Sequence, residues 1–561
     1  MKPPSRRLNL SPSPSPTPRR AAAPLAALAL TLLATACTAS GAPTAALGAR
    51  PAPGGTLTYA TDREPTCLDP HVAGDMPQAY VAQQYLESLV ALDERGKAEP
   101  WLATSWDIAK DGRTYTFHLR RDVRFTDGTR FDAAAVKANF EHMVDPDTQS
   151  GTAGGYLAPY RKTEVVDAFT ARVHLDRPYS PFLNMLAQAF LGMESPKALK
   201  RGKEANCAAP VGTGPFIVKE WNRQSDVVLV RNPRYNSPPP YARHTGPAHV
   251  AKVVWRFIPE PATRFAAVQS GQVDVIDALP PEDQASAERD SRLKVVTRDR
   301  PGNPTNLALN TSRAPFDDLR VRKAFLHSAD VANGLKSVFF GQYRRAGGPL
   351  SYVTPHYTDA HENAWPYDPK KSNALLDQAG WGHRDGDGYR TKRGERLSAD
   401  VLLKSDISPN QLALMEQIQA TAKDVGFQLR LLRLDAATVN TRYLAGKYDL
   451  RDGYWNTNTP DVLHTVFGSE YAVKNGIHSN AAYVKDPALD RLFREAQATT
   501  DADKQRELYG EAQKSLSAGA YQLTLYPQTT RLAAHRASAR GASLEPALSL
   551  PYLYDAWVNA R

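Results

Sequence analysis

The sequence predicts an α/β protein of two lobes in close contact, and three observations support this prediction. Strand-like and helix-like segments alternate from Gly55 onward, a second series of the same kind begins near Leu307, and no long disordered linker separates the two series. The chain has 561 residues, 42% hydrophobic and 23% charged, which is the composition of a globular protein large enough for two cores.

The first series opens with a strand over 55–61, where apolar residues alternate with threonines. A helix is expected over 77–90, because Pro77 suits a first turn and apolar residues follow at helical spacing. Alternating apolar residues on both sides of Asp111-Gly112 predict a β-hairpin. Asp132 then stands where the cap of a further helix is expected.

The rest of the first series and the whole second series follow the same α/β pattern. After Gly212-Thr-Gly214, which we expect to form a backbone turn, a strand pair is predicted over 216–218 and 227–230. The remaining predicted elements are a strand at 253–258, a helix through 265–268 ended by Gly271, a strand at 273–276, helices at 318–328 and 369–379, a strand at 399–403, a helix at 411–425 and a strand at 428–434.

Residues 1–36 are typical of an export signal. They hold five basic residues and no acidic residue, and the apolar run Ala21–Ala36 is shorter than the about 20 residues that span a membrane. Small residues lead directly into Cys37, which resembles a bacterial lipobox and predicts lipidation of Cys37 as the first mature residue. An ordinary signal with an incidental cysteine remains open, and Arg19-Arg20 leaves a twin-arginine route open.

Residues 37–54 are expected to form the lipidated cysteine and a flexible tether, since they are built mainly from Thr, Ala, Ser, Gly and Pro. Loss of the five basic residues in 1–36 would reduce the formal charge of +10 to about +5. No block of Lys and Arg with interleaved aromatic residues is present, so nucleic acid is not an expected partner.

The remaining cysteines, Cys67 and Cys207, make an even pair in an oxidising compartment, where a disulfide is favoured over two separate buried thiols.

Catalytic motifs are not evident in the sequence: the chain has no Gly-x-Ser-x-Gly, His-Glu-x-x-His, Walker or Cys-x-x-Cys motif. The 13 histidines show no metal-ligand spacing, and Asp385-Gly-Asp387 predicts a hairpin turn better than a calcium loop. We therefore predict no enzyme, no cofactor and no metal site.

Several motifs resemble a known family. The run Glu99–Trp106, continued through Asp111–Phe117, Val123–Thr129 and Val136–Phe140, resembles the signature of the peptide/nickel extracellular solute-binding family of ABC importers. Further matching motifs follow in the order the family uses: Gly212–Phe216, Arg231–Tyr235, Ala314–Phe316, Asp318–Ala324, Tyr367–Pro369 and Ala379–Trp381. The resemblance extends over nearly the whole chain from about residue 55.

The resemblance implies a two-lobed periplasmic-binding-protein fold (type 2, large, cluster-C-like) with a ligand cleft between the lobes. Lobe I would comprise 55–300 and a return segment 525–561, and lobe II would comprise 301–524. In this family the segments of Cys67 and Cys207 are neighbours, which strengthens the prediction of a disulfide.

The family's cleft includes the loop after the first strand and a loop of lobe II that begins with tryptophan. The corresponding predicted ligand-binding residues are Asp75, Met76, Tyr80, Tyr454, Trp455, Asn456, Asn458 and Asp461. Peptide-binding relatives place a carboxylate a few residues after the tryptophan, whereas this chain has Thr457 and Asn458 there. Asp461 as a helix cap and Trp455 as a plain core residue remain open.

The resemblance implies a non-enzymatic receptor that captures a short peptide or related small solute by lobe closure and delivers it to ABC permease subunits. The alternative is the same scaffold with a non-peptide cargo, such as a nickel chelate, an oligosaccharide or an opine-like metabolite. An extracellular enzyme or a signalling receptor on this fold is the rival from another class. The expected protein is a monomer, exported and held at the outer face of the cell membrane by its lipid anchor.

Overall fold

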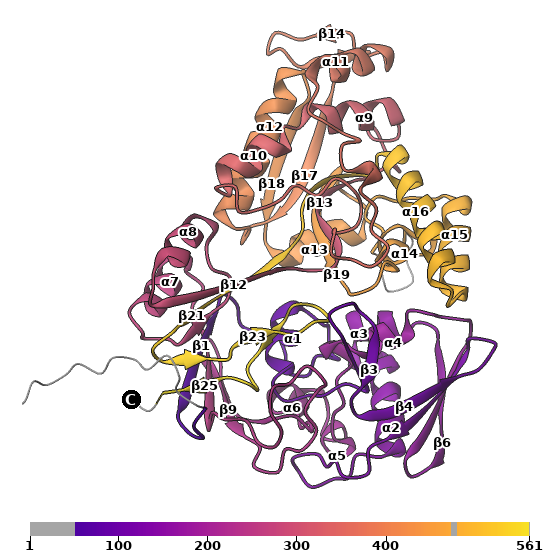
Figure 1. The fold of residues 1–561 in the computed structure, drawn as a ribbon. Helices are drawn as coiled ribbons and strands as arrows, with labels where there is room; N and C mark the ends of the chain where they lie inside the picture. Colours follow the sequence, from indigo (N-terminus) through magenta and orange to yellow (C-terminus); the bar gives the residue numbers. More distant parts are fainter. Residues whose placement is uncertain (1–50, 473–478, 560–561) are drawn as a thin grey trace, which may run out of the picture. The chain divides into compact units, whose positions relative to one another are not determined.

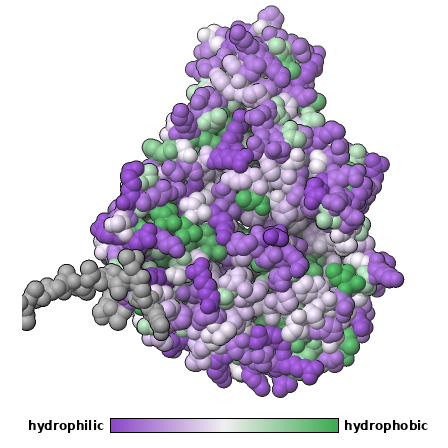
Figure 2. Space-filling model, in the orientation of Figure 1, coloured by the Kyte–Doolittle hydropathy of each residue, from purple (hydrophilic) through white to green (hydrophobic). Residues whose placement is uncertain are grey.

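The computed structural model describes residues 51–472 and 479–559. The predicted signal over 1–36, the predicted lipidation at Cys37 and most of the predicted tether lie outside the described residues. Within the described ranges, no helix combines the length and the apolar character needed to cross a bilayer. Figure 2 shows one face of the molecule, on which hydrophilic residues predominate and hydrophobic residues form small patches.

Two mixed β-sheets with flanking helices organise the folded chain, which confirms the predicted α/β class. We call the part built on the seven-stranded sheet lobe I and the part built on the five-stranded sheet lobe II (Figure 1). The seven strands, in spatial order, are β12 (Leu293–Asp299), β21 (Thr529–His535), β11 (Val275–Ile276), β1 (Thr56–Thr61), β10 (Lys252–Phe257), β9 (Asp226–Arg231) and β8 (Phe216–Asn222).

The sheet of lobe II holds strands from the second α/β series. In spatial order they are β18 (Gln428–Leu434), β17 (Ser398–Lys404), β19 (Leu450–Asn456), β13 (Gly302–Leu309) and β20 (Gln522–Tyr526). β17 pairs in parallel with both β18 and β19, whereas β13 is antiparallel to β19 and β20. Helix α12 packs beside β18 in this lobe (Figure 1).

Lobe I also contains a four-stranded antiparallel sheet, and smaller ribbons occur in both lobes. The four strands are β4 (Ala103–Ile108), β5 (Thr114–Leu119), β7 (Thr170–Leu175) and β6 (Tyr160–Asp167). The ribbons are β2 (Val90–Leu92) with β3 (Ala98–Pro100), β22 (Ala539–Arg540) with β25 (Trp557–Val558), β23 (Ser543–Leu544) with β24 (Pro551–Tyr552), and β14 (His383–Arg384) with β15 (Arg390–Lys392) and β16 (Glu395–Arg396).

The helices divide between the lobes in chain order. In lobe I they are α1 (Met76–Ala82), α2 (Ala133–Val144), α3 (Thr152–Tyr156), α4 (Phe182–Leu186), α5 (Pro196–Leu199), α6 (Lys203–Ala208), α7 (Pro261–Gln269) and α8 (Pro281–Arg289). In lobe II they are α9 (Leu319–Ser328), α10 (Val331–Val338), α11 (Pro369–Gln378), α12 (Pro409–Asp424), α13 (Ala436–Leu444), α14 (Val462–Phe467), α15 (Pro487–Ala498) and α16 (Ala502–Gly519).

The chain passes between the two sheets twice, and the two crossings are neighbours. β12 ends at Asp299 and β13 begins at Gly302, while β20 ends at Tyr526 and β21 begins at Thr529. β12 pairs with β21 on the lobe I side, and β13 pairs with β20 on the lobe II side. The lobe limits expected from the sequence, 55–300, 301–524 and 525–561, stay a prediction.

Most local predictions are confirmed where the signal lies within a few residues. β4 and β5 form the predicted hairpin around Asp111-Gly112. Asp132 accepts a hydrogen bond from the backbone N–H of Ala135 and caps α2 as expected. The turn at Asp385 is a hairpin turn, because it joins the antiparallel strands β14 and β15. Its carboxylate accepts from the backbone N–H groups of Asp387 and Tyr389.

The helix expected over 77–90 is wrong in length, since α1 ends at Ala82. Beyond that point the backbone binds a distant segment: the N–H of Gly214 donates to the carbonyl of Tyr85 at 3.0 Å, and the N–H of Phe216 donates to Gln84 at 3.2 Å. A Cβ atom at Gly212 would lie 1.9 Å from the carbonyl oxygen of Tyr85, so glycine permits this close approach. A tertiary contact therefore overrides the helical periodicity.

A disulfide joins Cys67 and Cys207, which confirms the predicted pair. Cys67 follows β1 and Cys207 lies in α6, and the N–H of Leu68 donates to the carbonyl of Cys207 at 2.9 Å. Since the sequence separation of the two cysteines is 140, the bond connects segments that are remote in sequence. Lobe I packs around one large apolar cluster, which includes Trp255 and Phe140.

Candidate ligand cleft

The loop that follows β19 connects the two lobes through hydrogen bonds. The side-chain amide of Gln188 donates to Oγ1 of Thr457 at 3.0 Å and to Oδ1 of Asn458 at 3.2 Å. Nδ2 of Asn458 donates in turn to the backbone carbonyl of Asn184 at 2.9 Å. Both polar ends of the Asn458 side chain are therefore bound to lobe I, and the side chain is only 3% exposed.

Asp461 lies at the same boundary, buried to 1% exposure. Its carboxylate accepts from the hydroxyl of Tyr179 in lobe I at 3.1 Å, and from Gln497 at 2.8 Å and Tyr509 at 3.3 Å in lobe II. Burial raises the pKa of Asp461. Asp461 occupies the N-cap position of α14, as the alternative interpretation expected, but its side chain makes no capping hydrogen bond and is directed to Tyr179, Gln497 and Tyr509 instead.

Trp455 contacts lobe I as well as its own lobe. Its indole N–H donates to the hydroxyl of Tyr156 at 3.3 Å, and the ring is partly buried against apolar residues of lobe II. Trp455 and Asp461 both line a small cavity of about 20 Å³, whose wall also includes Tyr156 and Tyr179 from lobe I. This volume corresponds to roughly one water molecule.

A second group of cleft residues is charged and keeps contact with solvent. Arg63 and Asp62 follow β1 and pair at 3.5 Å, with side chains 54% and 37% exposed. The guanidinium of Arg63 also binds the hydroxyl of Tyr454 on β19, so this group spans both lobes. Desolvation lowers the pKa of Arg63. The neighbouring side chains Asp62, Tyr454 and Asp75 raise this pKa by more, so the net shift is upward.

Arg300 directly follows β12, between the two sheets, and is 7% exposed. Its Nε donates to Oγ1 of Thr530 at 2.8 Å, and its Nη2 donates to the hydroxyl of Tyr80. None of the described residues forms an ion pair with Arg300. Burial lowers the pKa of Arg300, as expected for a cation without a carboxylate partner.

Two carboxylates in this region are electrostatic neighbours of one lysine. Asp75 caps α1 by accepting from the backbone N–H of Gln78 at 3.0 Å, and burial raises its pKa while Lys404 of lobe II acts in the opposite direction. Burial also raises the pKa of Asp452 on β19, again opposed by Lys404. Positive and negative side chains from both lobes therefore gather at the same boundary.

The structure divides the predicted ligand-binding residues into two groups. Asp75, Tyr80 and Tyr454 lie with Arg63 and Arg300, and Met76 begins α1 beside Asp75. The others line the small cavity or hold the lobes together: they are Trp455, Asn456, Asn458 and Asp461. Nδ2 of Asn456 is buried without a hydrogen-bond partner.

Sequence reasoning missed Arg63, Arg300 and Lys404. None of the three belongs to a spaced motif, because their proximity depends on how the two sheets meet. The sequence offers one weak signal for each arginine: Arg63 is a cation soon after the first strand, and Arg300 is a cation at a lobe crossing.

Comparison with known proteins identifies the family. The profile of the bacterial extracellular solute-binding proteins, family 5 (middle part), matches residues 97–472. The chain belongs to this family. Family 5 proteins are the substrate-binding components of ABC importers, so the chain is a binding protein and not an enzyme.

Curated relatives of this family 5 protein carry the name glutathione-binding protein GsiB. The protein from Salmonella choleraesuis (strain SC-B67) is 30% identical over 465 residues, which covers 80% of this chain and 84% of the relative. The protein from Escherichia coli O157:H7 is 29% identical over 469 residues, with the same two coverages.

Solved structures confirm the two-lobed periplasmic-binding-protein fold. NikA from Brucella suis, in complex with Fe(III)-EDTA, has a TM-score of 0.79 and 25% identity, covering 90% of this chain and all of that one (100%). The oligopeptide-binding protein AppA from Bacillus subtilis, in complex with a nonapeptide, has a TM-score of 0.78 and 20% identity over 91% of this chain and 100% of its own.

Proposed function

We propose that this family 5 protein captures a short peptide or peptide-like solute that carries at least one free carboxylate and an ammonium group. One observation carries the proposal: Arg300 is a buried cation between the lobes without an ion-pair partner among the described residues. A buried charge is costly unless an opposite charge compensates it, and a ligand carboxylate in the cleft supplies that charge. Arg63, which lies near Arg300, offers a second contact.

The ammonium group of such a ligand needs a carboxylate in the cleft. Asp461 is unsuited to this role, because its oxygens already accept three hydrogen bonds within the protein. Asp75 and Asp452 are better candidates, since they lie near Lys404 at the boundary and are half-buried. In this proposal they replace the carboxylate that peptide-binding relatives have after the tryptophan.

Lobe closure is the capture step of the proposed function. Tyr156, Tyr179 and Gln188 of lobe I bind partners in lobe II only when the lobes meet, so a ligand that contacts both lobes favours the closed state. The permease then receives the ligand from the closed form. We further propose that residues 1–36 direct export, that lipidated Cys37 anchors a monomer to the outer face of the membrane, and that the tether ends near residue 54.

Isothermal titration calorimetry tests the ligand class. Glutathione, an unmodified tripeptide and the same tripeptide with an amidated C-terminus are titrated into the full chain. We expect glutathione or the unmodified tripeptide to bind. Amidation should weaken tripeptide binding at least about tenfold, because it removes the negative charge opposite Arg300. Equal binding of the two tripeptides would contradict the role of Arg300.

Two arginine variants localise the effect. Arg300→Gln removes the buried cation, and Arg298→Gln removes a neighbouring cation that pairs with Glu94 at the surface. We expect R300Q to lose affinity for the carboxylate ligand and R298Q to keep it. Loss of affinity in both variants to the same degree would indicate a general charge effect instead of a site.

A non-peptide cargo is the second candidate. The observation in its favour is that Asn458 stands near the position where peptide-binding relatives have an amine-pairing carboxylate, and that its side chain is engaged by Gln188 and Asn184. Binding of an opine-like carboxylate or a metal chelate, with no binding of any peptide or of glutathione, would favour this candidate.

A further inference from the structure

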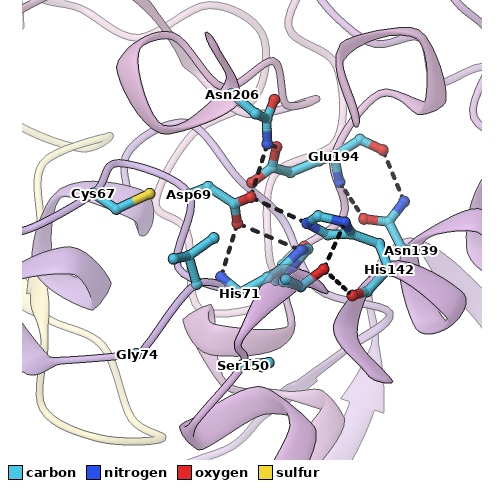
Figure 3. Close-up of polar contacts among 12 residues, drawn as sticks. Cys67, Asp69, His71, Gly74, Asn139, His142, Ser150, Glu194 and Asn206 are labelled. Carbon is cyan, nitrogen blue, oxygen red and sulfur yellow. Dashed lines mark hydrogen bonds and ion pairs between the residues drawn. The ribbon is translucent and has the colours of Figure 1, made fainter. Parts of the chain in front are cut away.

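Five polar side chains of lobe I converge close to Cys67 (Figure 3). They are Asp69, His71, His142, Glu194 and Asn206. All except His142 are buried to 1% exposure or less, and the His142 side chain is 17% exposed. A ligating atom from each of Asp69, His71 and His142 lies within 4.8 Å of the other two.

The inner nitrogens of the two histidines face the same carboxylate. Nδ1 of His71 lies 3.6 Å from Oδ1 of Asp69, and Nε2 of His142 lies 3.2 Å from Oδ2 of Asp69. When three ligands surround a Zn²⁺ ion at about 2.0–2.1 Å, tetrahedral geometry separates neighbouring ligand atoms by roughly 3.3 Å. The two measured distances are close to this separation.

The outer nitrogens of both histidines are held by oxygen atoms. Nε2 of His71 lies 2.8 Å from the backbone carbonyl of Gly192, which can only accept, so this nitrogen carries the proton. Nδ1 of His142 lies 3.2 Å from Oγ1 of Thr148, whose own hydrogen is donated to the backbone carbonyl of His142 at 2.6 Å. A neutral His71 ring therefore directs its Nδ1 lone pair at Asp69. Nε2 of His142 donates a hydrogen bond of 3.2 Å to Oδ2 of Asp69, and a bound ion would replace the proton of this contact. Outer contacts of this kind are typical of metal-ligating histidines.

Two buried atoms in the cluster have no hydrogen-bond partner: Nδ1 of His71 and Oε1 of Glu194. Glu194 is connected to Asp69 through Asn206, whose Nδ2 donates to Oε2 of Glu194 at 2.6 Å and to Oδ2 of Asp69 at 2.9 Å. A neutral amide does not cancel the repulsion between two buried carboxylates. A cation among Asp69, His71 and His142 would satisfy Nδ1 of His71 and offset the charge of the carboxylates.

We propose that Asp69, His71 and His142 form a site for a divalent transition-metal ion of the Zn²⁺ class. Two imidazole nitrogens with a carboxylate oxygen are a ligand set that zinc accepts. The site is separate from the ligand cleft and independent of the cargo. His142, the partly exposed member, marks the route by which an ion enters.

The site joins segments that are far apart in the chain. Asp69 and His71 follow β1, whereas His142 lies in the last turn of α2. A bound ion would therefore fix the loop that leads from Cys67 to Asp75, the residue that caps α1 beside the cleft. In this way the metal stabilises the lobe I wall of the cleft without touching the cargo.

Cobalt substitution tests the proposal on the full chain. Protein stripped with a chelator is titrated with Co²⁺ alone, and visible d–d absorption reports a tetrahedral site. We expect one equivalent of Co²⁺ to produce the bands, Zn²⁺ to abolish them, and Zn²⁺ to raise the melting temperature of the stripped protein. Absence of the bands and of any Zn²⁺-dependent rise in melting temperature in the wild-type chain overturns the proposal.

Two histidine variants complete the test. His142→Gln removes one ligand, whereas His244→Gln breaks a matched pair, since His244 lies 3.0 Å from Asp555 with side chains 18% and 5% exposed. We expect H142Q to weaken Co²⁺ binding at least about tenfold and H244Q to leave it unchanged. Equal Co²⁺ binding in both variants would place the ion elsewhere and refute the site. Should H142Q fail to fold, the wild-type titration still decides the proposal.

Discussion

The hydroxyl of Tyr179 in lobe I donates a hydrogen bond of 3.1 Å to Oδ2 of Asp461 in lobe II. The contact is buried on both sides, with Tyr179 5% and Asp461 1% exposed. Because the two residues belong to different lobes, the bond exists only while the lobes meet. The bond therefore contributes to the free energy of lobe closure and not to the folding free energy of either lobe alone.

Tyr179→Phe should weaken closure and, with it, ligand affinity. A hydrogen bond to a carboxylate contributes about 1.5–3 kcal/mol, so the dissociation constant of a bound peptide should rise roughly tenfold or more. Tyr509→Phe is the matched control, since it removes a hydroxyl that binds the same carboxylate from within lobe II. Calorimetry with small-angle X-ray scattering checks both variants; an equal loss of affinity in Y509F would contradict the assignment to closure.

Glu87 should make stability depend on pH. The side chain is 1% exposed, and burial raises its pKa to about 7 although Ser237, Tyr235 and Trp101 donate to it. Because the folded-state pKa is raised, this contribution to stability is complete below the unfolded pKa of about 4.5 and is lost as pH rises toward 7. The free energy of unfolding of the wild type relative to Glu87→Gln should fall by up to about 3 kcal/mol across that window.

Urea denaturation of both proteins between pH 4.5 and 8 measures this difference. The comparison isolates Glu87 because other buried carboxyl groups, such as Asp277, are present in both proteins. Glu99→Gln, a substitution near the surface on β3, should give no such pH-dependent difference. A constant difference between wild type and E87Q across the window would show that Glu87 does not titrate there.

Two glycine substitutions should have opposite effects. Gly212→Ala places a Cβ 1.9 Å from the backbone oxygen of Tyr85, and the resulting overpacking should cost about 1–3 kcal/mol of unfolding free energy. Gly510→Ala lies within α16 with no atom within 4 Å of the new Cβ, and should stabilise by about 0.5–1 kcal/mol. Denaturant titrations measure both, and a stable G212A protein would contradict the close approach.

Loss of the Cys67–Cys207 bond should destabilise lobe I. With a sequence separation of 140 between the cysteines, the double substitution to serine should lower the free energy of unfolding by about 2–5 kcal/mol. The reduced wild type provides the internal comparison, because it lacks the same covalent bond with both cysteines in place. Unfolding of the two proteins at the same urea concentration is expected, and no shift from the oxidised wild type would be inconsistent with a stabilising bond.

The fold could be predicted from the sequence wherever the decisive signal is local. The Asp111-Gly112 hairpin, the Asp132 cap and the strand at 428–434 each depend on residues within a few positions of one another. The end of α1 does not, because the backbone of Tyr85 binds Gly214, which lies more than a hundred residues away. Periodicity carries no information about such a partner.

The site was only partly predictable for the same physical reason. The resemblance to the family leads to Trp455 and Asp461, which do lie between the lobes. It does not lead to Arg300, which we propose as a ligand contact because it is buried without an ion-pair partner among residues 51–472 and 479–559. His71 and His142 also escape any spacing rule, since the fold and not the sequence brings them to Asp69.

The antiparallel pairing of β13 with β20 places the first and last strands of lobe II side by side, with Leu307 opposite Leu523. Lobe II is thus an insert whose two ends leave through adjacent strands of one sheet. A lobe with this topology can be exchanged for that of another family member through two splice points that are close in space. Half of the binding surface can then change in one recombination event while the other half is inherited intact.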